Sequence, residues 1–332
     1  MDMADWLEAG LKELGYKVTS SDTYVEPSAI NVFWDCFQPG MAEKIFAAGV
    51  KFGIIATEIP DGIGFNWRNE PEWLERYSAF REVAKGASFI WTMVESTLPY
   101  YSELCTTAYI ELGFSEKLIP KYINDIPTID FSFFGLKTPY RESVVSRLRA
   151  YAKVEWSDKF LSTDEVALLI AKTKINLSFK QSEKWPVPSP TRIGRLMMAK
   201  RVIAAERTEV VTRQADIVGL PSEGEDFVDF ALNKLKSNWR AKAEEVFESY
   251  RVLMPMKQIM QNVVDKTFNQ FQKPKKNRGS FAALLPRSLR LWQKLWRGSK
   301  KSHISLADLL PPSLVKSIGC WNIVTWNHQY FA

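Results

Sequence analysis

Residues 129–206 contain the feature that most constrains the fold of this chain, a regular alternation of strand-like and helix-like segments. Apolar, β-branched and aromatic runs predict four buried strands, which are IDFSFFG, AKVEW, KINLSF and RVIAAE. Segments of helical periodicity separate them, namely RESVVSRLRAY, TDEVALLIAKT and TRIGRLMMA. This alternation is typical of a parallel sheet covered by helices. We therefore expect an α/β fold.

The first third of the chain alternates in the same way and predicts a second sheet. Its strand candidates are YKVTS, AINVFWDCF, VKFGIIATE and ASFIWTMVE, and YYSELCTTAYIELG predicts a helix after them. Beyond Glu206, ADIVGL predicts a short strand before a helical region that ends near Phe271. Pro127 and its polar neighbours break both periodicities, so we place a domain boundary there. The predicted parts are residues 1–125, residues 126–271 and a tail of residues 272–332.

The composition is that of a soluble globular protein, with 46% apolar and 25% charged residues. No apolar run reaches the roughly 18 residues that span a bilayer, and the N-terminus lacks a basic flank followed by an apolar stretch. We therefore expect a cytoplasmic protein. Three isolated cysteines and two histidines near the C-terminus predict neither a disulfide framework, nor a metal site, nor histidine-based catalysis.

The net charge of +6 belongs to the tail, because residues 273–301 hold ten Lys or Arg and no Asp or Glu. The segment Leu284–Trp296 is basic, and its Leu and Trp residues share one helical face. We favour an amphipathic helix that binds an anionic membrane surface, which implies a peripheral location on the inner face of the membrane. The alternatives are burial of that face against the body of the protein and, less favoured, nucleic-acid binding.

The end of the chain bears on the first sheet. A doubly wound domain normally starts with a buried strand, whereas this chain starts with the helix-like DWLEAGLKELG. The terminal WNIVTW could fill the missing position and complete the N-terminal sheet. The alternative is that this strand pairs at an edge or with a neighbouring chain.

A candidate anion site follows the third strand of residues 129–206. Parallel sheets bind ligands at the carboxyl ends of their strands. One of these ends carries a proline-rich loop and then Ser189, Thr191 and Arg192 at the start of a helix. Free N–H groups and the helix dipole favour an anion at such a position.

These residues carry a resemblance to a known family. The run PSPTRIGRLMMAKRVIAAE, with KINLSF before it, resembles the C-terminal domain of GT-B glycosyltransferases, most of all the bacterial group with spore-protein-CgeB-like C-terminal regions. The resemblance covers residues 129–250 and extends more loosely to the N-terminal domain. It implies two Rossmann-like doubly wound domains of GT-B type, to which this chain adds a basic, partly helical C-terminal extension.

The resemblance also implies a nucleotide-sugar donor, held mostly by the C-terminal domain in a cleft between the two. Arg192 and Lys137 would then contact the diphosphate, and Ser189 and Thr191 would donate hydrogen bonds to it. Glu206 could accept from sugar or ribose hydroxyls. The alternatives are a surface arginine, a solvated lysine and a salt bridge from Glu206 to Arg207 or Arg201. Neither a cofactor nor a metal ion is expected.

The chain departs from the family at the glutamate pair that many retaining members carry, because those positions fall on Pro186 and Gly194. An inverting reaction needs a base from the N-terminal domain. The candidates at strand ends are Asp35, Glu58, Asp61 and Glu95. We favour Glu58 or Asp61, since Gly62 and Gly64 would let this loop approach a ligand. The alternative role of Asp61 is a turn cap.

The predicted function is therefore transfer of a sugar from a nucleotide-sugar to a glycan, a lipid-linked glycan or a protein. Trp67 has two possible roles. It either belongs to the core or lines an acceptor site. The contrasting hypothesis is a non-catalytic nucleotide- or glycan-binding scaffold of the same fold, which the missing glutamate pair supports.

Overall fold

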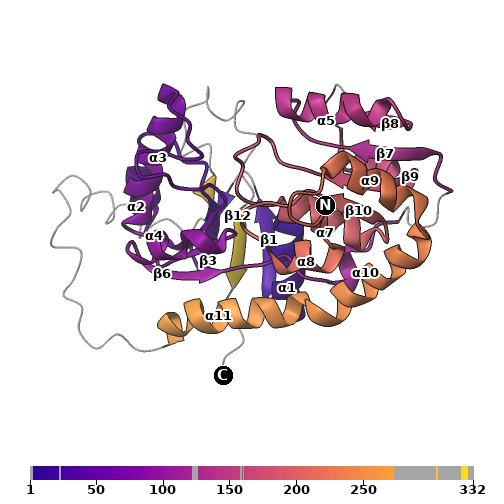
Figure 1. Cartoon of the computed structure of the whole chain (residues 1–332). Coiled ribbons are helices and arrows are strands. Elements are labelled where there is room, and N and C mark those ends of the chain that lie inside the picture. Colours follow the sequence, from indigo (N-terminus) through magenta and orange to yellow (C-terminus); the bar gives the residue numbers. More distant parts are fainter. Residues whose placement is uncertain are drawn as a thin grey trace. The chain divides into compact units, whose positions relative to one another are not determined.

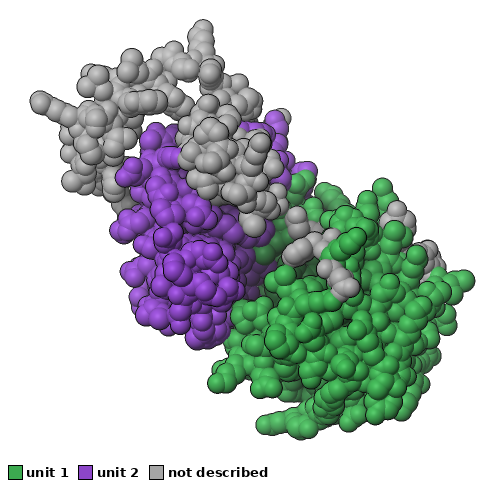
Figure 2. Space-filling model, turned by 90° about the horizontal axis from the view of Figure 1, so that it is seen from above, with its two compact units in different colours: residues 1–10, 111–259 green, residues 11–110, 260–332 purple. Residues whose placement is uncertain are grey.

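The computed structural model describes residues 3–21, 24–121, 126–157, 159, 161–272, 304–305 and 323–327. The chain forms two compact units, which Figure 2 colours separately: unit 1 comprises residues 1–10 and 111–259, and unit 2 comprises residues 11–110 and 260–332. Each unit is built on one main sheet of largely parallel strands with helices packed on it (Figure 1). The prediction of two Rossmann-like α/β units is confirmed.

Unit 2 contains a six-stranded sheet in the order β1-β12-β3-β4-β5-β6. Its strands are β1 (Lys17–Ser21), β3 (Ala29–Trp34), β4 (Lys51–Ala56), β5 (Phe89–Thr92), β6 (Thr106–Tyr109) and β12 (Ile323–Asn327). A separate pair consists of β2 (Tyr24–Val25) and β11 (Ile304–Ser305). The helices are α2 (Met41–Ala48), α3 (Pro71–Ala84), α4 (Leu98–Ser102) and the 3-10 helix η1 (Glu95–Thr97).

Strands β3 to β6 run parallel, so their carboxyl ends meet at one edge of the sheet. Strand β3 is buried along almost its whole length, as expected for the apolar run AINVFW in a central strand. Phe33, Phe52, Ile54 and Phe80 belong to one core cluster that joins the sheet to α3. Asp35 and Glu58 follow the buried strands β3 and β4, and the sheet brings them to the same edge.

Strand β12 lies within the sheet of unit 2. It pairs antiparallel with β1, where Val18 lies opposite Trp326, and antiparallel with β3, where Val32 lies opposite Val324. The terminal WNIVTW segment therefore supplies a strand of the N-terminal sheet, as one of the two hypotheses predicted. The position between β1 and β3 is thus filled by the last strand that the structure describes.

Unit 1 contains a four-stranded parallel sheet in the order β10-β9-β7-β8. Its strands are β7 (Ile129–Phe133), β8 (Val154–Trp156), β9 (Thr173–Ser178) and β10 (Val202–Ala205). Its helices are α5 (Pro139–Arg149), α6 (Thr163–Ala171), α7 (Pro190–Met198), α8 (Arg213–Val218), α9 (Phe227–Lys236), α10 (Trp239–Leu253) and the 3-10 helix η2 (Glu116–Leu118). Phe131, Phe133, Ile175 and Leu177 form one core with α5 and α9, because alternate residues of a strand face the same side.

Two predicted elements are wrong. YYSELCTTAYIELG contains α4 followed by β6, because Thr106 and Thr107 open an extended segment that pairs with β5. ADIVGL is the end of α8 rather than a strand, because the Thr212 hydroxyl caps this helix by accepting from the N–H of Ala215. Gly219, with φ of 71°, follows the last turn of α8.

The compact units differ from the predicted division at residues 125 and 271. Helices α1 (Met3–Glu13) and α11 (Met256–Gln272) each have residues in both units. Residues 111–121 belong to unit 1 because Gly113 accepts from the Trp6 indole at 2.9 Å and Leu112 from the Gln214 amide at 2.7 Å. The end of α11 belongs to unit 2, where Phe268 stacks on Trp91.

The segment Leu284–Trp296, predicted to bind a membrane surface, lies outside the described residues. Within the part of the chain that the structure describes, no helix combines the length and apolarity that crossing a bilayer requires.

Candidate functional site

Arg192 lies at the start of α7, next to the carboxyl end of β7. Its Nε donates to the carbonyl oxygen of Phe134 at 3.2 Å, and its guanidinium lies 4.6 Å from the ring centre of Phe133. Gly135 follows with φ of 144°, and a Cβ there would lie 2.8 Å from Nη2 of Arg192. Glycine is thus required at this turn for both its backbone conformation and the close approach of the arginine.

A second arginine, which the sequence analysis missed, packs on the same ring. Arg141 is 6% exposed and lies 5.0 Å from the ring centre of Phe133. Its Nε and Nη1 donate to the carbonyl oxygens of Lys180 and Leu136 at 3.1 and 2.9 Å. A signal for Arg141 was present in the sequence, because the residue occupies the first turn of the helix that follows the strand and glycine.

The electrostatics of this arginine pair, Arg141 and Arg192, favour an anion. Burial, together with the positive charges of Arg141 and Arg195, lowers the pKa of Arg192 to about 9. Burial also lowers the pKa of Arg141, to about 10, although the charge of Glu206 acts in the opposite direction. Among the described residues, no carboxylate forms an ion pair with either guanidinium. A bound anion would offset both the burial and the repulsion.

Three further residues were predicted to contact the diphosphate of the nucleotide-sugar, namely Ser189, Thr191 and Lys137. Ser189 and Thr191 are half-buried at the start of α7, and their hydroxyl oxygens lie 3.4 Å apart. Ser189 is the N-cap residue, yet its side chain makes no capping hydrogen bond. Lys137 is exposed, and its Nζ lies 5.4 Å from the ring centre of Trp156.

Glu206 directly follows β10 and is only 9% exposed. Its carboxylate accepts from the backbone N–H of Lys180 at 2.8 Å, pairs with Nζ of Lys180 at 3.1 Å and accepts from the Tyr140 hydroxyl. Burial and this hydrogen bond raise the pKa of Tyr140. The salt-bridge partner is Lys180 rather than Arg207 or Arg201, which donate to backbone carbonyls. Tyr140, Lys180 and Glu206 line a cavity of about 1120 Å³ within unit 1.

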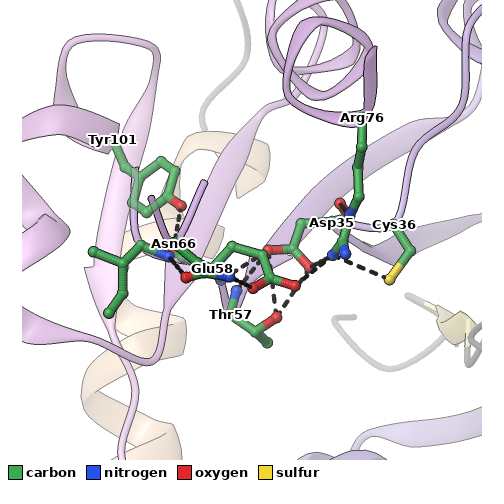
Figure 3. Close-up of polar contacts among 8 residues, drawn as sticks. Asp35, Cys36, Thr57, Glu58, Asn66, Arg76 and Tyr101 are labelled. Atoms are coloured by element: carbon green, nitrogen blue, oxygen red, sulfur yellow. Dashed lines mark hydrogen bonds and ion pairs between the residues drawn. The ribbon is translucent and has the colours of Figure 1, made fainter. Parts of the chain in front are cut away.

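A second polar cluster lies in unit 2 at the carboxyl ends of β3 and β4 (Figure 3). Nη2 of Arg76, from α3, lies 2.6 Å from Oε1 of Glu58 and 3.6 Å from Oδ1 of Asp35. Asn66 donates its amide to the other oxygen of Glu58, and the Tyr101 hydroxyl donates to the Glu58 carbonyl at 2.9 Å. The arginine was missed in the sequence, although it stands three residues after Trp73 on one helical face.

The two carboxylates of this cluster differ in access to solvent. The side chain of Asp35 is fully buried, whereas that of Glu58 is 18% exposed. Asp35 accepts from the N–H of Thr57 at 2.7 Å and of Glu58 at 3.2 Å, so it holds the start of the loop after β4. Burial, followed by the charge of Glu58, raises the pKa of Asp35 from 3.8 to about 7. Glu58 is therefore the more accessible of the two carboxylates.

The substitution Asp35→Asn is expected to flatten the pH dependence of the stability of unit 2. The folded carboxyl keeps its proton at pH values where the unfolded chain has lost it. It therefore contributes stability that is complete below pH 3.8 and is lost as pH rises through about 7. Between these limits the wild type should lose on the order of 3 kcal/mol more unfolding free energy than the variant, whose amide stays neutral. Urea unfolding at several pH values measures this difference, and equal slopes for both proteins would contradict it.

Two further base candidates follow strands of the same sheet, Asp61 after β4 and Glu95 after β5. Both oxygens of Asp61 accept from backbone N–H groups, of Gly64 at 2.8 Å and of Trp67 at 2.6 Å, which is the turn-capping arrangement. Glu95 is exposed at the start of η1. In the described ranges, no group of three or more His, Cys, Asp or Glu side chains could hold a metal ion.

Comparison with known proteins gives structural similarity alone. No family model and no curated protein matches the sequence. Among solved structures, S. aureus TarM in complex with fondaparinux, alpha-GlcNAc-glycerol and UDP is 11% identical, with a TM-score of 0.44 over 67% of this chain and 51% of TarM. The chain thus spans about half the length of TarM.

Two trehalose-phosphate-related structures are also similar. One, titled trehalose-6-phosphate from E. coli bound with UDP-2-fluoro glucose, is 9% identical over 68% of this chain and 70% of its own, with a TM-score of 0.45. The apo structure of OtsA is 8% identical over 79% of this chain and 77% of its own, with a TM-score of 0.48. Both of these structures and TarM are below 25% identity to the chain, so the function of the chain has to be argued from its own residues.

Proposed function

We propose that this protein is a glycosyltransferase that moves a sugar from a nucleotide-sugar donor to an acceptor hydroxyl. The observation that carries the proposal is the arginine pair in unit 1. Two guanidiniums pack on the ring of Phe133, that of the buried Arg141 and that of the half-buried Arg192, and neither forms an ion pair with a carboxylate among the described residues. They lie at a strand end and a helix start, where diphosphates bind in folds of this class. The resemblance of residues 129–250 to GT-B glycosyltransferases supports the same ligand.

In this proposal Arg141 and Arg192 bind the diphosphate and neutralise the charge that develops on it as the bond to the sugar breaks. The hydroxyls of Ser189 and Thr191 donate hydrogen bonds to phosphate oxygens. Glu206 accepts from a sugar or ribose hydroxyl at the wall of the cavity. Side-chain cations rather than a metal ion balance the leaving group.

The acceptor half of the reaction is proposed for unit 2. Glu58 takes the proton of the acceptor hydroxyl as the new glycosidic bond forms, and a nucleoside diphosphate leaves. Arg76 and Asp35 act through Glu58 as positioning residues. A glycan, a lipid-linked glycan or a protein would supply the hydroxyl, and we propose a cytoplasmic enzyme that binds the inner face of the membrane peripherally.

The substitution Arg192→Ala is expected to weaken nucleoside diphosphate binding by about 10- to 100-fold, because a charge-assisted hydrogen bond contributes about 1.5–3 kcal/mol. Isothermal titration calorimetry with UDP, GDP, ADP and CDP measures the change. Arg149→Ala is the matched control, since this exposed arginine ends helix α5. Equal affinities of both variants and the wild type would contradict the assignment of the arginine pair.

A non-catalytic scaffold of the same fold is the second candidate. One observation favours it: a Cβ on Gly194 would lie 3.0 Å from the Trp6 ring and from the Gln214 amide, so this position has no space for a carboxylate. A hydrolysis and transfer assay with a panel of nucleotide-sugars separates the two candidates. Nucleotide binding without turnover of any donor would favour the scaffold.

A further inference from the structure

The loop that follows β4 has a strained and heavily fixed backbone. Asn66 and Trp67 both have φ of 58°, in the left-handed region that non-glycine residues rarely adopt. Each such residue costs about 1 kcal/mol or more, so the surrounding contacts must impose the conformation. The Asp61 carboxylate accepts from the N–H of Trp67. The side-chain oxygen of Asn66 accepts from the N–H of Ile59 at 3.0 Å.

The loop anchors one aromatic residue and exposes another. Phe65 is fully buried and packs edge-on against Tyr77 and Phe80. Two residues with a large apolar side chain on the same loop remain exposed, Trp67 at 57% and Ile63 at 70%. The indole of Trp67 is therefore displayed on a rigid support, so a ligand would bind it with little loss of conformational entropy.

Trp67 directly follows Asn66, a member of the polar cluster of unit 2. Asn66 donates its amide to the Glu58 carboxylate. Glu58 also pairs with Arg76, and its side chain is 18% exposed. An aromatic face, a carboxylate, an amide and a guanidinium thus come from one loop and the helix beside it.

We propose that Trp67 is the platform on which a pyranose ring of a carbohydrate acceptor stacks, with hydroxyls of the same or the next sugar directed to Glu58 and Asn66. A pyranose has an apolar face of C–H groups and a rim of hydroxyls, so it needs an aromatic surface beside hydrogen-bonding side chains. This inference rests on the proposed function and narrows its acceptor to a glycan. An exposed apolar patch alone would suit a membrane, but the strained backbone beside the carboxylate favours a directional ligand.

Saturation-transfer NMR on the full chain tests the platform with a panel of methyl α- and β-hexopyranosides and their di- and trisaccharides. At least one glycan should bind, and Trp67→Ala should weaken its binding by about tenfold, since that factor is what one aromatic contact contributes. Trp67→Phe should restore most of the binding because it keeps an aromatic face. Ile63→Ala is the matched control on the same loop and should bind as the wild type does.

Nucleoside diphosphate binding, measured on the same samples, separates the two levels of inference. Nucleotide binding with no glycan signal, or with a glycan signal that Trp67→Ala leaves unchanged, overturns the platform and leaves the proposed function standing. Glycan binding that depends on Trp67 without nucleotide binding overturns the proposed function and leaves the platform. The protein is also tested for flotation with anionic vesicles. If the wild type floats, both Trp67→Ala and Ile63→Ala abolish flotation and no glycan binds, the platform is overturned in favour of a membrane contact.

Discussion

Deletion of residues 321–332 is expected to unfold unit 2 while unit 1 keeps its structure. Strand β12 pairs with five residues of β1 and four of β3, so its removal leaves β1 without its neighbour and turns the buried β3 into an edge strand. Each lost backbone hydrogen bond contributes about 0.5–1.5 kcal/mol net. The total loss, on the order of 5 kcal/mol, is comparable with the whole stability of a domain.

Hydrogen exchange measured by mass spectrometry resolves the two units in this experiment. Peptides from β3 and β4 should lose protection, whereas peptides from β7 and β9 should keep it. Thr325→Pro is a milder variant of full length, because proline removes one backbone donor from the central position of β12. Unchanged protection of β3 in the deletion variant would show that the strand is dispensable.

Arg76→Ala is expected to destabilise unit 2 by about 3 kcal/mol, because it leaves Asp35 and Glu58 close together without their shared cation. The guanidinium also stacks 4.9 Å from the ring centre of Trp73, and that contact is lost too. Loss of the positive charge should raise the pKa of Asp35 further, since Arg76 lowers it in the wild type.

Thermal and urea unfolding measure the effect of Arg76→Ala, and a neighbouring arginine provides the control. Arg68 stacks on the same indole at 4.8 Å and pairs with an exposed glutamate, Glu70. Arg68→Ala should therefore unfold as the wild type does. At alkaline pH, where the Asp35 carboxyl of the single variant loses its proton, the double variant Arg76→Ala with Asp35→Asn should recover part of the loss, because its amide stays neutral. Additive losses would mean that the two side chains do not interact.

The strands of both sheets were largely predictable because their signal is local. IDFSFFG, KINLSF and RVIAAE are mostly apolar runs, and each contains a largely buried parallel strand. The wrong elements, α4 with β6 and α8, are short segments whose state is decided by partners distant in sequence or by a single cap. TTAY pairs with β5, and Thr212 caps α8, so neither periodicity nor propensity could assign them.

The candidate sites were predictable only as strand ends. Arg192 was predicted because it lies at the start of a helix, and Glu58 because it follows a strand. Both positions lie at the carboxyl ends of parallel strands, which each sheet brings together at one edge. Arg141 and Arg76 were missed because an arginine on a helix usually faces solvent. Their burial depends on the packing of Phe133 and Trp73 beneath them, which becomes visible only in three dimensions.

The position of β12 also sets the order in which the protein matures during synthesis. Residues 11–110 leave the ribosome early, but their sheet waits for residues 323–327. At about 5–20 residues per second, this wait lasts roughly 10–40 s. All residues of unit 1, which are 1–10 and 111–259, are synthesised before β12. The unit that is translated first is thus finished last, and a chaperone that shields the open edges of β1 and β3 would act on the nascent chain in this interval.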